Sequence, residues 1–168
     1  MDKRKSAYTI PATEEHCYLM AGKLRKADVD EIWAVAPMKP IEALLYSVQD
    51  SKEAISVMMP DSEIPVCMFG LGRPMNILDK RRSVWLLGTD EVRHVRRSFI
   101  EDAGRYLETI AAGETVYNYV MKDNIASLHW LKILGFSIME AKPFGWLQKP
   151  FHYVQKDFPK CVLSHSQQ

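Results

Sequence analysis

One stretch decides the fold of this chain: Asp123-Asn124-Ile125-Ala126-Ser127-Leu128-His129-Trp130-Leu131-Lys132-Ile133-Leu134-Gly135-Phe136. Asn124 predicts a helix N-cap, because its side chain can accept the free N–H groups of a first helical turn. Apolar residues then recur every three positions from Ile125 to Leu134, which indicates one buried stripe along a short helix. Gly135 predicts the helix end, and a strand resumes at Phe136. These features alone also fit a generic helix that connects two strands.

The composition favours one soluble domain. The chain has 168 residues and is 47% hydrophobic, which is enough for one sizeable core. A net charge of +1, from 22 basic and 21 acidic residues, argues against extensive binding to nucleic acid or a membrane surface. Neither an apolar run of about 18 residues nor a secretory signal is visible. We therefore expect a cytoplasmic protein with one domain over 1–168, its core over about 6–156 and a polar tail over 157–168.

The cysteines and histidines give no sign of a metal site or a disulfide framework. Cys17, Cys67 and Cys161 are odd in number and far apart, without a CxxC pair. This spacing favours reduced thiols. The five histidines lack the spacing of known metal ligands, so no metal is expected.

The order of predicted elements indicates an α/β fold with a mixed, mostly antiparallel sheet and helices on both faces. Two apolar strands around the Asp61-Ser62 turn predict a hairpin, whereas helices separate the later strands. Strands are expected over 8–10, 54–59, 65–71, 84–87, 115–121, 136–139 and 151–154, and helices over 13–23, 27–33, 40–48, 99–111 and 124–134.

This order, with Asn124, Ser127 and Leu134-Gly135-Phe136, resembles the GNAT acyltransferases, which transfer an acyl group from coenzyme A to an amine. The resemblance implies a single-domain GNAT-like fold that binds acetyl-CoA or CoA. The segments 85–90, 130–136 and 150–152 further resemble the small GNAT-like proteins of T7-like tailed phages. That likeness implies a phage protein in the cytoplasm of the bacterial host or in the virion, with a host protein or a phage structural protein as its partner.

The resemblance places the CoA pyrophosphate at Arg93-His94-Val95-Arg96-Arg97-Ser98, where the family has a glycine-rich loop before a helix. Arg96 stands where the family has glycine, and a side chain there crowds the approach of phosphate to the backbone. Arg93, Arg97 and Arg96 itself could instead bind phosphate through guanidinium groups. The alternative is that these arginines are simply solvated. The resemblance also assigns cofactor contacts to three residues outside this loop: Leu87, Asn124 and Ser127.

Catalysis requires a base for the attacking amine and a proton donor for the departing thiolate. Many family members have a tyrosine donor where this chain has Leu131, which cannot donate a proton. The expected base is Asp90, Glu91 or His94, at the end of the central strand. Thr89 or Asp90 could equally cap the next helix. His129 is expected to lie on the surface.

Two functions of different class follow from these residues. The first is an N-acyltransferase with a degenerate motif that acts on a host or phage protein or on a small amine. The second is a catalytically weak or inactive accessory protein that keeps the fold in order to bind a host enzyme or to take part in virion assembly. The fold alone does not decide between them.

Overall fold

A computed structural model describes residues 6–160 except 75, 77, 80 and 96, and gives only the backbone of residues 97–99. The helices are α1 (Glu14–Ala21), α2 (Lys26–Val35), α3 (Pro40–Asp50), the 3-10 helix η1 (Asp90–His94), α4 (Arg97–Ile110) and α5 (Ile125–Ile133). The strands are β1 (Tyr8–Pro11), β2 (Ser51–Met58), β3 (Cys67–Gly72), β4 (Arg81–Gly88), β5 (Thr115–Met121), β6 (Ser137–Ile138), β7 (Lys142–Phe144) and β8 (Lys149–Asp157).

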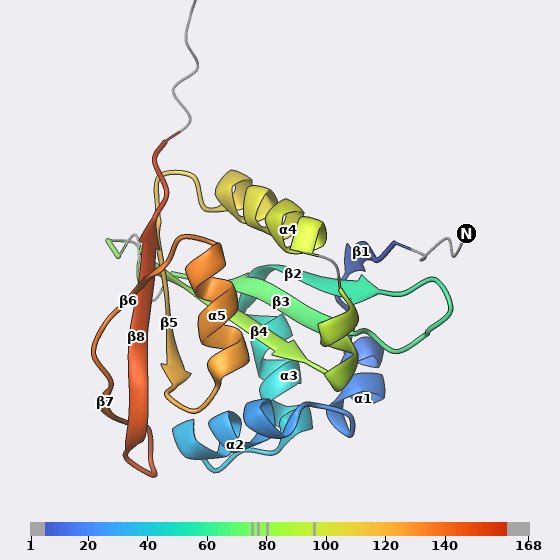
Figure 1. The fold of residues 1–168 in the computed structure, drawn as a ribbon, viewed down its shortest axis with the longest axis horizontal. Helices are drawn as coiled ribbons and strands as arrows, with labels where there is room; N and C mark the ends of the chain where they lie inside the picture. Colours follow the sequence, from blue (N-terminus) through green and yellow to red (C-terminus); the bar gives the residue numbers. More distant parts are fainter. Residues whose placement is uncertain (1–5, 75, 77, 80, 96, 161–168) are drawn as a thin grey trace, which may run out of the picture.

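All eight strands form one sheet, in the order β1-β2-β3-β4-β5-β8-β6, with β7 paired to β8 (Figure 1). Every pair is antiparallel except β4 and β5, which run parallel. The expected mixed, mostly antiparallel α/β sheet is therefore confirmed.

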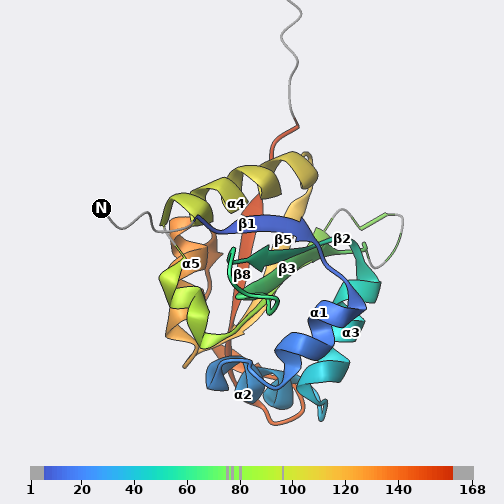
Figure 2. The ribbon, with the colours of Figure 1, turned by 90° about the vertical axis from the view of Figure 1, so that its right-hand side faces the viewer.

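Helices cover both faces of this sheet (Figure 2). Side chains alternate along β4, so Val84 and Leu86 pack in the core toward α4 and α5. Trp85 and Leu87 pack on the opposite face with residues of α1 and α3. This arrangement explains why the sequence of β4 is a continuous apolar run, because both faces of the strand are covered.

The pairing of β4 with β5 ends soon after it begins. The paired residues run from Arg81↔Thr115 to Ser83↔Tyr117, although β4 continues to Gly88. Beyond that point the two strands diverge, and α5 lies over the gap between them (Figure 1). This divergence positions the candidate site.

Three local features differ from the sequence expectation. The segment 93–98 was expected to be a loop, but its first two residues form the end of η1. Thr89 is the N-cap of η1, and the Thr89 hydroxyl accepts the Glu91 N–H at 3.3 Å. Thr89 is thus a helix cap, as one alternative predicted, but the helix that it caps is η1 and not the predicted helix over 99–111. Strand β7 was not predicted, because Lys142–Phe144 is too short to show an alternating pattern. The packed core also continues to Phe158, which is buried.

Candidate functional site

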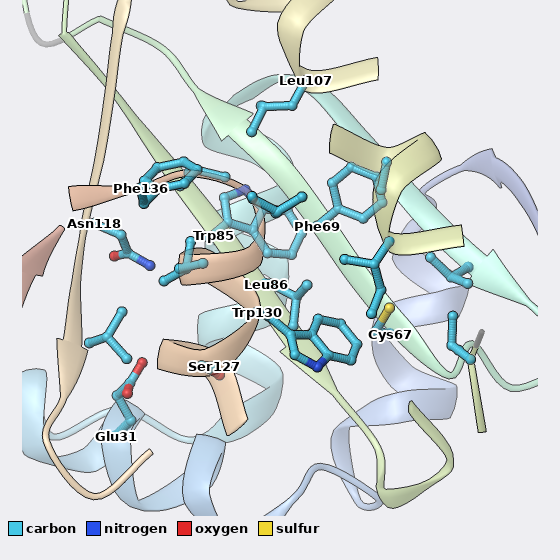
Figure 3. A pocket seen from close by; sticks show the side chains of 18 residues that line it. Glu31, Cys67, Phe69, Trp85, Leu86, Leu107, Asn118, Ser127, Trp130 and Phe136 are labelled. Atoms are coloured by element: carbon cyan, nitrogen blue, oxygen red, sulfur yellow. The ribbon is translucent and has the colours of Figure 1, made fainter. Parts of the chain in front are cut away.

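A cavity of about 90 Å³ lies where β4 and β5 diverge. Apolar side chains from the sheet and from α5 form most of its wall, among them Phe69, Leu86, Trp130 and Leu131. Figure 3 shows Trp130 on one side of this space and Glu31 on the other. The cavity is large enough for several water molecules or for a small acyl group.

The polar part of the wall consists mainly of Glu31 from α2, Asn118 from β5 and Ser127 from α5. The Glu31 carboxylate is fixed through Oε2, which accepts the backbone N–H of Met121 at 2.8 Å and the Asn124 side-chain amide at 3.1 Å. Burial raises the pKa of Glu31 from 4.5 to about 7, although both hydrogen bonds favour the ionised form and act in the opposite direction.

Asp28, one helical turn before Glu31, is fully buried and has a cationic partner. Arg25 donates to both of its carboxylate oxygens, at 2.7 and 3.0 Å, and the Gly88 N–H donates at 2.8 Å. Within the described part of the chain, no ion pair joins a cation to Glu31. The two neighbouring carboxylates therefore differ, because only the charge of Asp28 is balanced by direct contact.

Asn124 joins this network to α5. It is the N-cap of that helix, as the sequence predicted, and its Oδ1 accepts the Ser127 N–H at 3.4 Å. Its amide donates to Asp28 at 3.4 Å as well as to Glu31. Arg25 in turn donates to the Ser127 hydroxyl at 3.2 Å. These contacts hold α2 against the start of α5 and the ends of β4 and β5.

The residues predicted for catalysis do not contribute to the cavity wall. Asp90, Glu91 and His94 are exposed on η1, where Glu91 and His94 form a 3.0 Å contact. No group of three or more His, Cys, Asp and Glu in the described part of the chain could hold a metal ion. The expected surface position of His129 is confirmed.

Among the described residues predicted to bind cofactor, only Ser127 contributes to the cavity wall. Arg93 is exposed on η1, and Leu87 packs on the opposite face of the sheet. Arg97 and Ser98 open α4, with side chains outside the described set. Arg96 lies outside the described residues altogether. The roles of these residues stay predictions.

Sequence reasoning missed Arg25, Asp28, Glu31 and Asn118. Acidic residues near the start of α2 are common because they stabilise the helix dipole, and that interpretation needs no site. The available signal was the spacing of Asp28 and Glu31, which places two carboxylates on one helix face. The hydrogen-bond partners of these two carboxylates, Gly88, Met121 and Asn124, are distant from them in the sequence. Local sequence patterns could therefore not identify this network.

Several solved acetyltransferases share the fold of this chain. The fold matches a spermidine N-acetyltransferase from Vibrio cholerae in complex with CoA and spermine, with a TM-score of 0.66 and 13% identity over 91% of this chain and 96% of that one. A GNAT superfamily phosphinothricin acetyltransferase from Sinorhizobium meliloti in complex with AcCoA matches with a TM-score of 0.65 and 10% identity, over 92% of this chain and 89% of that one. A ribosomal-protein-alanine N-acetyltransferase from Brucella melitensis matches with a TM-score of 0.63 and 13% identity, over 89% of this chain and 99% of that one.

At these identities the likeness shows the fold, which is that of the GNAT acetyltransferases. No protein-family model matches the sequence, and a search of curated proteins gives no significant match. None of the helices in the described residues is both long and apolar enough to cross a membrane.

Proposed function

We propose that this protein is an N-acyltransferase that uses acetyl-CoA as acyl donor and binds it at the divergence of β4 and β5. The observation that carries the proposal is the cavity at this point, which is apolar along most of its wall and carries the half-buried carboxylate of Glu31 at one end. When bound, the donor supplies an activated acyl group, and the protein has to hold it beside an amine.

The open edge of β4 fits the pantetheine arm of CoA, which contains two amides. The Thr89 N–H bonds to Val66 on the β3 side, whereas the Gly88 N–H points to Asp28. Because backbone groups alternate sides along a strand, those of Leu86 face the gap between β4 and β5. An extended amide chain can hydrogen-bond such an edge as an added strand does.

The start of α4 and the preceding loop fit the pyrophosphate of CoA. A helix N-terminus presents free backbone N–H groups to an anion. Arg93, Arg96 and Arg97 add positive charge in sequence beside that helix start. We assign Ser98 to the same contact and Ser127, which lines the cavity, to the acyl end.

Calorimetric titration of the wild-type protein with acetyl-CoA and with free CoA tests this function. We expect both to bind, and Ser127→Phe to weaken binding by filling the cavity. Ala126→Phe is the matched control, because it places the same bulk at an exposed position of the same helix. Absence of binding to the wild-type protein, or equal weakening by both variants, would contradict the proposed site.

The second candidate function is a GNAT-fold accessory protein with little or no catalysis. Leu131 favours it, because this side chain lines the cavity and cannot give a proton to a departing thiolate. In this version the protein is phage-encoded and binds a host enzyme or a virion protein, in the host cytoplasm or in the particle. Binding of acetyl-CoA without release of thiol in the presence of amines would support this candidate over the first.

A further inference from the structure

We propose that Glu31 accepts a proton from the amine acceptor and that Asn124 is the residue that positions the Glu31 carboxylate. This inference rests on the proposed acyltransferase function. It assigns the base to α2, in place of Asp90, Glu91 or His94 on the exposed helix η1.

One oxygen of Glu31 is anchored and the other is available to a ligand. The hydrogen bonds of this carboxylate within the described residues, from Met121 and Asn124, both fall on Oε2. No buried side-chain oxygen or nitrogen among the described residues lacks a partner. Oε1 therefore has solvent contact, and Glu31 is one of the residues that line the cavity.

The surroundings of Glu31 fit a proton acceptor for a primary amine. The charged groups that face it are Asp28 and Arg25, and these two neutralise each other in a bidentate pair. The other neighbours, Asn124 and the Met121 N–H, are neutral donors. An ammonium group that enters the cavity would therefore meet one carboxylate oxygen without a cationic partner.

The proton transfer balances without a further reactant. Glu31 takes one proton from the ammonium group, which frees the nitrogen lone pair to form a C–N bond with the acyl carbon while the C–S bond breaks. The second proton of the nitrogen passes to the departing sulfur, which leaves as a thiol. Glu31 then returns its proton to solvent. A base works best when its pKa lies near the working pH, and the pKa of Glu31 is about 7.

Asn124 acts on this step through Glu31. Its amide holds Oε2 at 3.1 Å while the Met121 N–H holds the same oxygen at 2.8 Å, so the carboxylate is fixed from two directions. The amide bond favours the ionised carboxylate and lowers the pKa of Glu31. Loss of the amide should therefore raise this pKa and move the pH dependence of the reaction upward.

The first experiment compares Glu31→Gln with Asp30→Asn, the same carboxylate-to-amide change at an exposed position of the same helix. Thiol release from acetyl-CoA is measured with n-butylamine, putrescine and a tetrapeptide as acceptors. We expect Glu31→Gln to lower kcat by about 10²–10⁴-fold and to leave calorimetric acetyl-CoA affinity unchanged. The kcat/KM of the wild type should decrease as the pH is lowered through about 7. The kcat/KM of Glu31→Gln should not show this decrease. Asp30→Asn should match the wild type.

The second experiment tests positioning with Asn124→Ser, because serine keeps an N-cap acceptor but lacks the amide donor. We expect the acidic limb of kcat/KM to move to higher pH, a change that a merely structural role would not produce. Carbon-13 NMR titration of the Glu31 carboxyl group measures its pKa directly and needs no turnover. We expect a higher Glu31 pKa in Asn124→Ser than in the wild type.

The two proposals fail in different ways. Absence of acetyl-CoA binding, or of turnover by the wild type, overturns the proposed function and this inference with it. Turnover that survives Glu31→Gln overturns the inference alone. An NMR titration with the Glu31 pKa at its ordinary 4.5 also overturns it, even if a variant fails to fold.

Discussion

The side-chain amide of Asn124, the N-cap of α5, donates a 3.1 Å hydrogen bond to the carboxylate of Glu31 on α2. This contact joins two helices that are far apart in the sequence and lie at the ends of the diverging strands. It also keeps a half-buried carboxylate in place beside the cavity. Removal of this carboxylate from solvent raises its pKa, against the effect of the hydrogen bond, and makes the stability of the fold depend on pH.

Glu31→Gln should stabilise the protein at neutral pH. The folded state holds the Glu31 proton up to a pH of about 7, whereas the unfolded chain releases it near 4.5. The stability contributed by the protonated group is therefore complete below the lower value and is lost as pH rises through the higher one. The difference corresponds to about 3 kcal/mol. Urea unfolding between these pH values should show a smaller decline for Glu31→Gln than for wild type, and equal slopes would contradict the burial of this charge.

Asp28→Ala should destabilise the protein strongly. The change leaves the Arg25 guanidinium and the Gly88 N–H without their carboxylate partner in a buried setting. Breaking one side of a buried ion pair typically costs about 3–5 kcal/mol. Asp30→Ala is the control, because its pair with Lys26 is exposed and such pairs contribute about 0.3–0.5 kcal/mol. Denaturant unfolding of both variants measures the difference, and similar losses would show that the Asp28 network contributes little.

Gly145→Ala should disrupt the contact between the β7–β8 turn and α2. Gly145 has a φ of 72°, and a Cβ atom there would clash with the Ala34 carbonyl oxygen. We expect a loss of more than about 2 kcal/mol, from backbone strain and this clash together. Gly22→Ala is the control, since Gly22 has a φ of −78° and nothing within 4 Å of the added atom. Thermal unfolding that ranks the two variants alike would contradict the close approach of the turn.

Removal of positive charge from η1 and from the first residue of α4 should weaken CoA binding. Charge-assisted contacts contribute about 1.5–3 kcal/mol each, so Arg93→Ala combined with Arg97→Ala should raise the Kd for CoA by more than about tenfold. The control combines Arg105→Ala with Lys132→Ala, which removes the same charge at exposed positions. If both double variants bind CoA equally, the pyrophosphate site lies elsewhere.

Most of the fold could be predicted from the sequence, because the patterns that indicate its helices and strands are local. The helix over Ile125–Ile133 has the predicted Asn124 cap, and Gly135 has the expected left-handed φ of 82°. The alternation over Thr115–Met121 places Val116 and Val120 in the core as expected for a strand. Each pattern depends on neighbours within a few positions, so it could be interpreted without the rest of the chain.

The candidate site could be predicted only in part, because it depends on contacts between distant segments. The cavity exists because the pairing of β4 with β5 ends at Ser83↔Tyr117, and no residue type marks that end. Glu31 belongs to the site through bonds to Met121 and Asn124, about ninety positions later. Its own sequence context resembles an ordinary helix start. The cap role of Asn124 is confirmed, whereas its contact with CoA remains a prediction.

The last prediction concerns the missing proton donor. Leu131 lines the cavity, so Leu131→Tyr would place a phenol hydroxyl beside the departing sulfur. General-acid catalysis typically contributes about 10²–10⁴-fold, and we expect thiol release by Leu131→Tyr to exceed that of both wild type and Leu131→Phe.

Leu131→Phe is the matched control, since it adds the same ring without the hydroxyl and carries the same cost of overpacking, about 1–3 kcal/mol. Calorimetry should show equal acetyl-CoA affinity for the two variants, which separates proton donation from binding. Equal rates for Tyr and Phe would mean that the hydroxyl cannot reach the sulfur. A wild type faster than both would show that Leu131 is itself part of a working site, in which positioning replaces an acid.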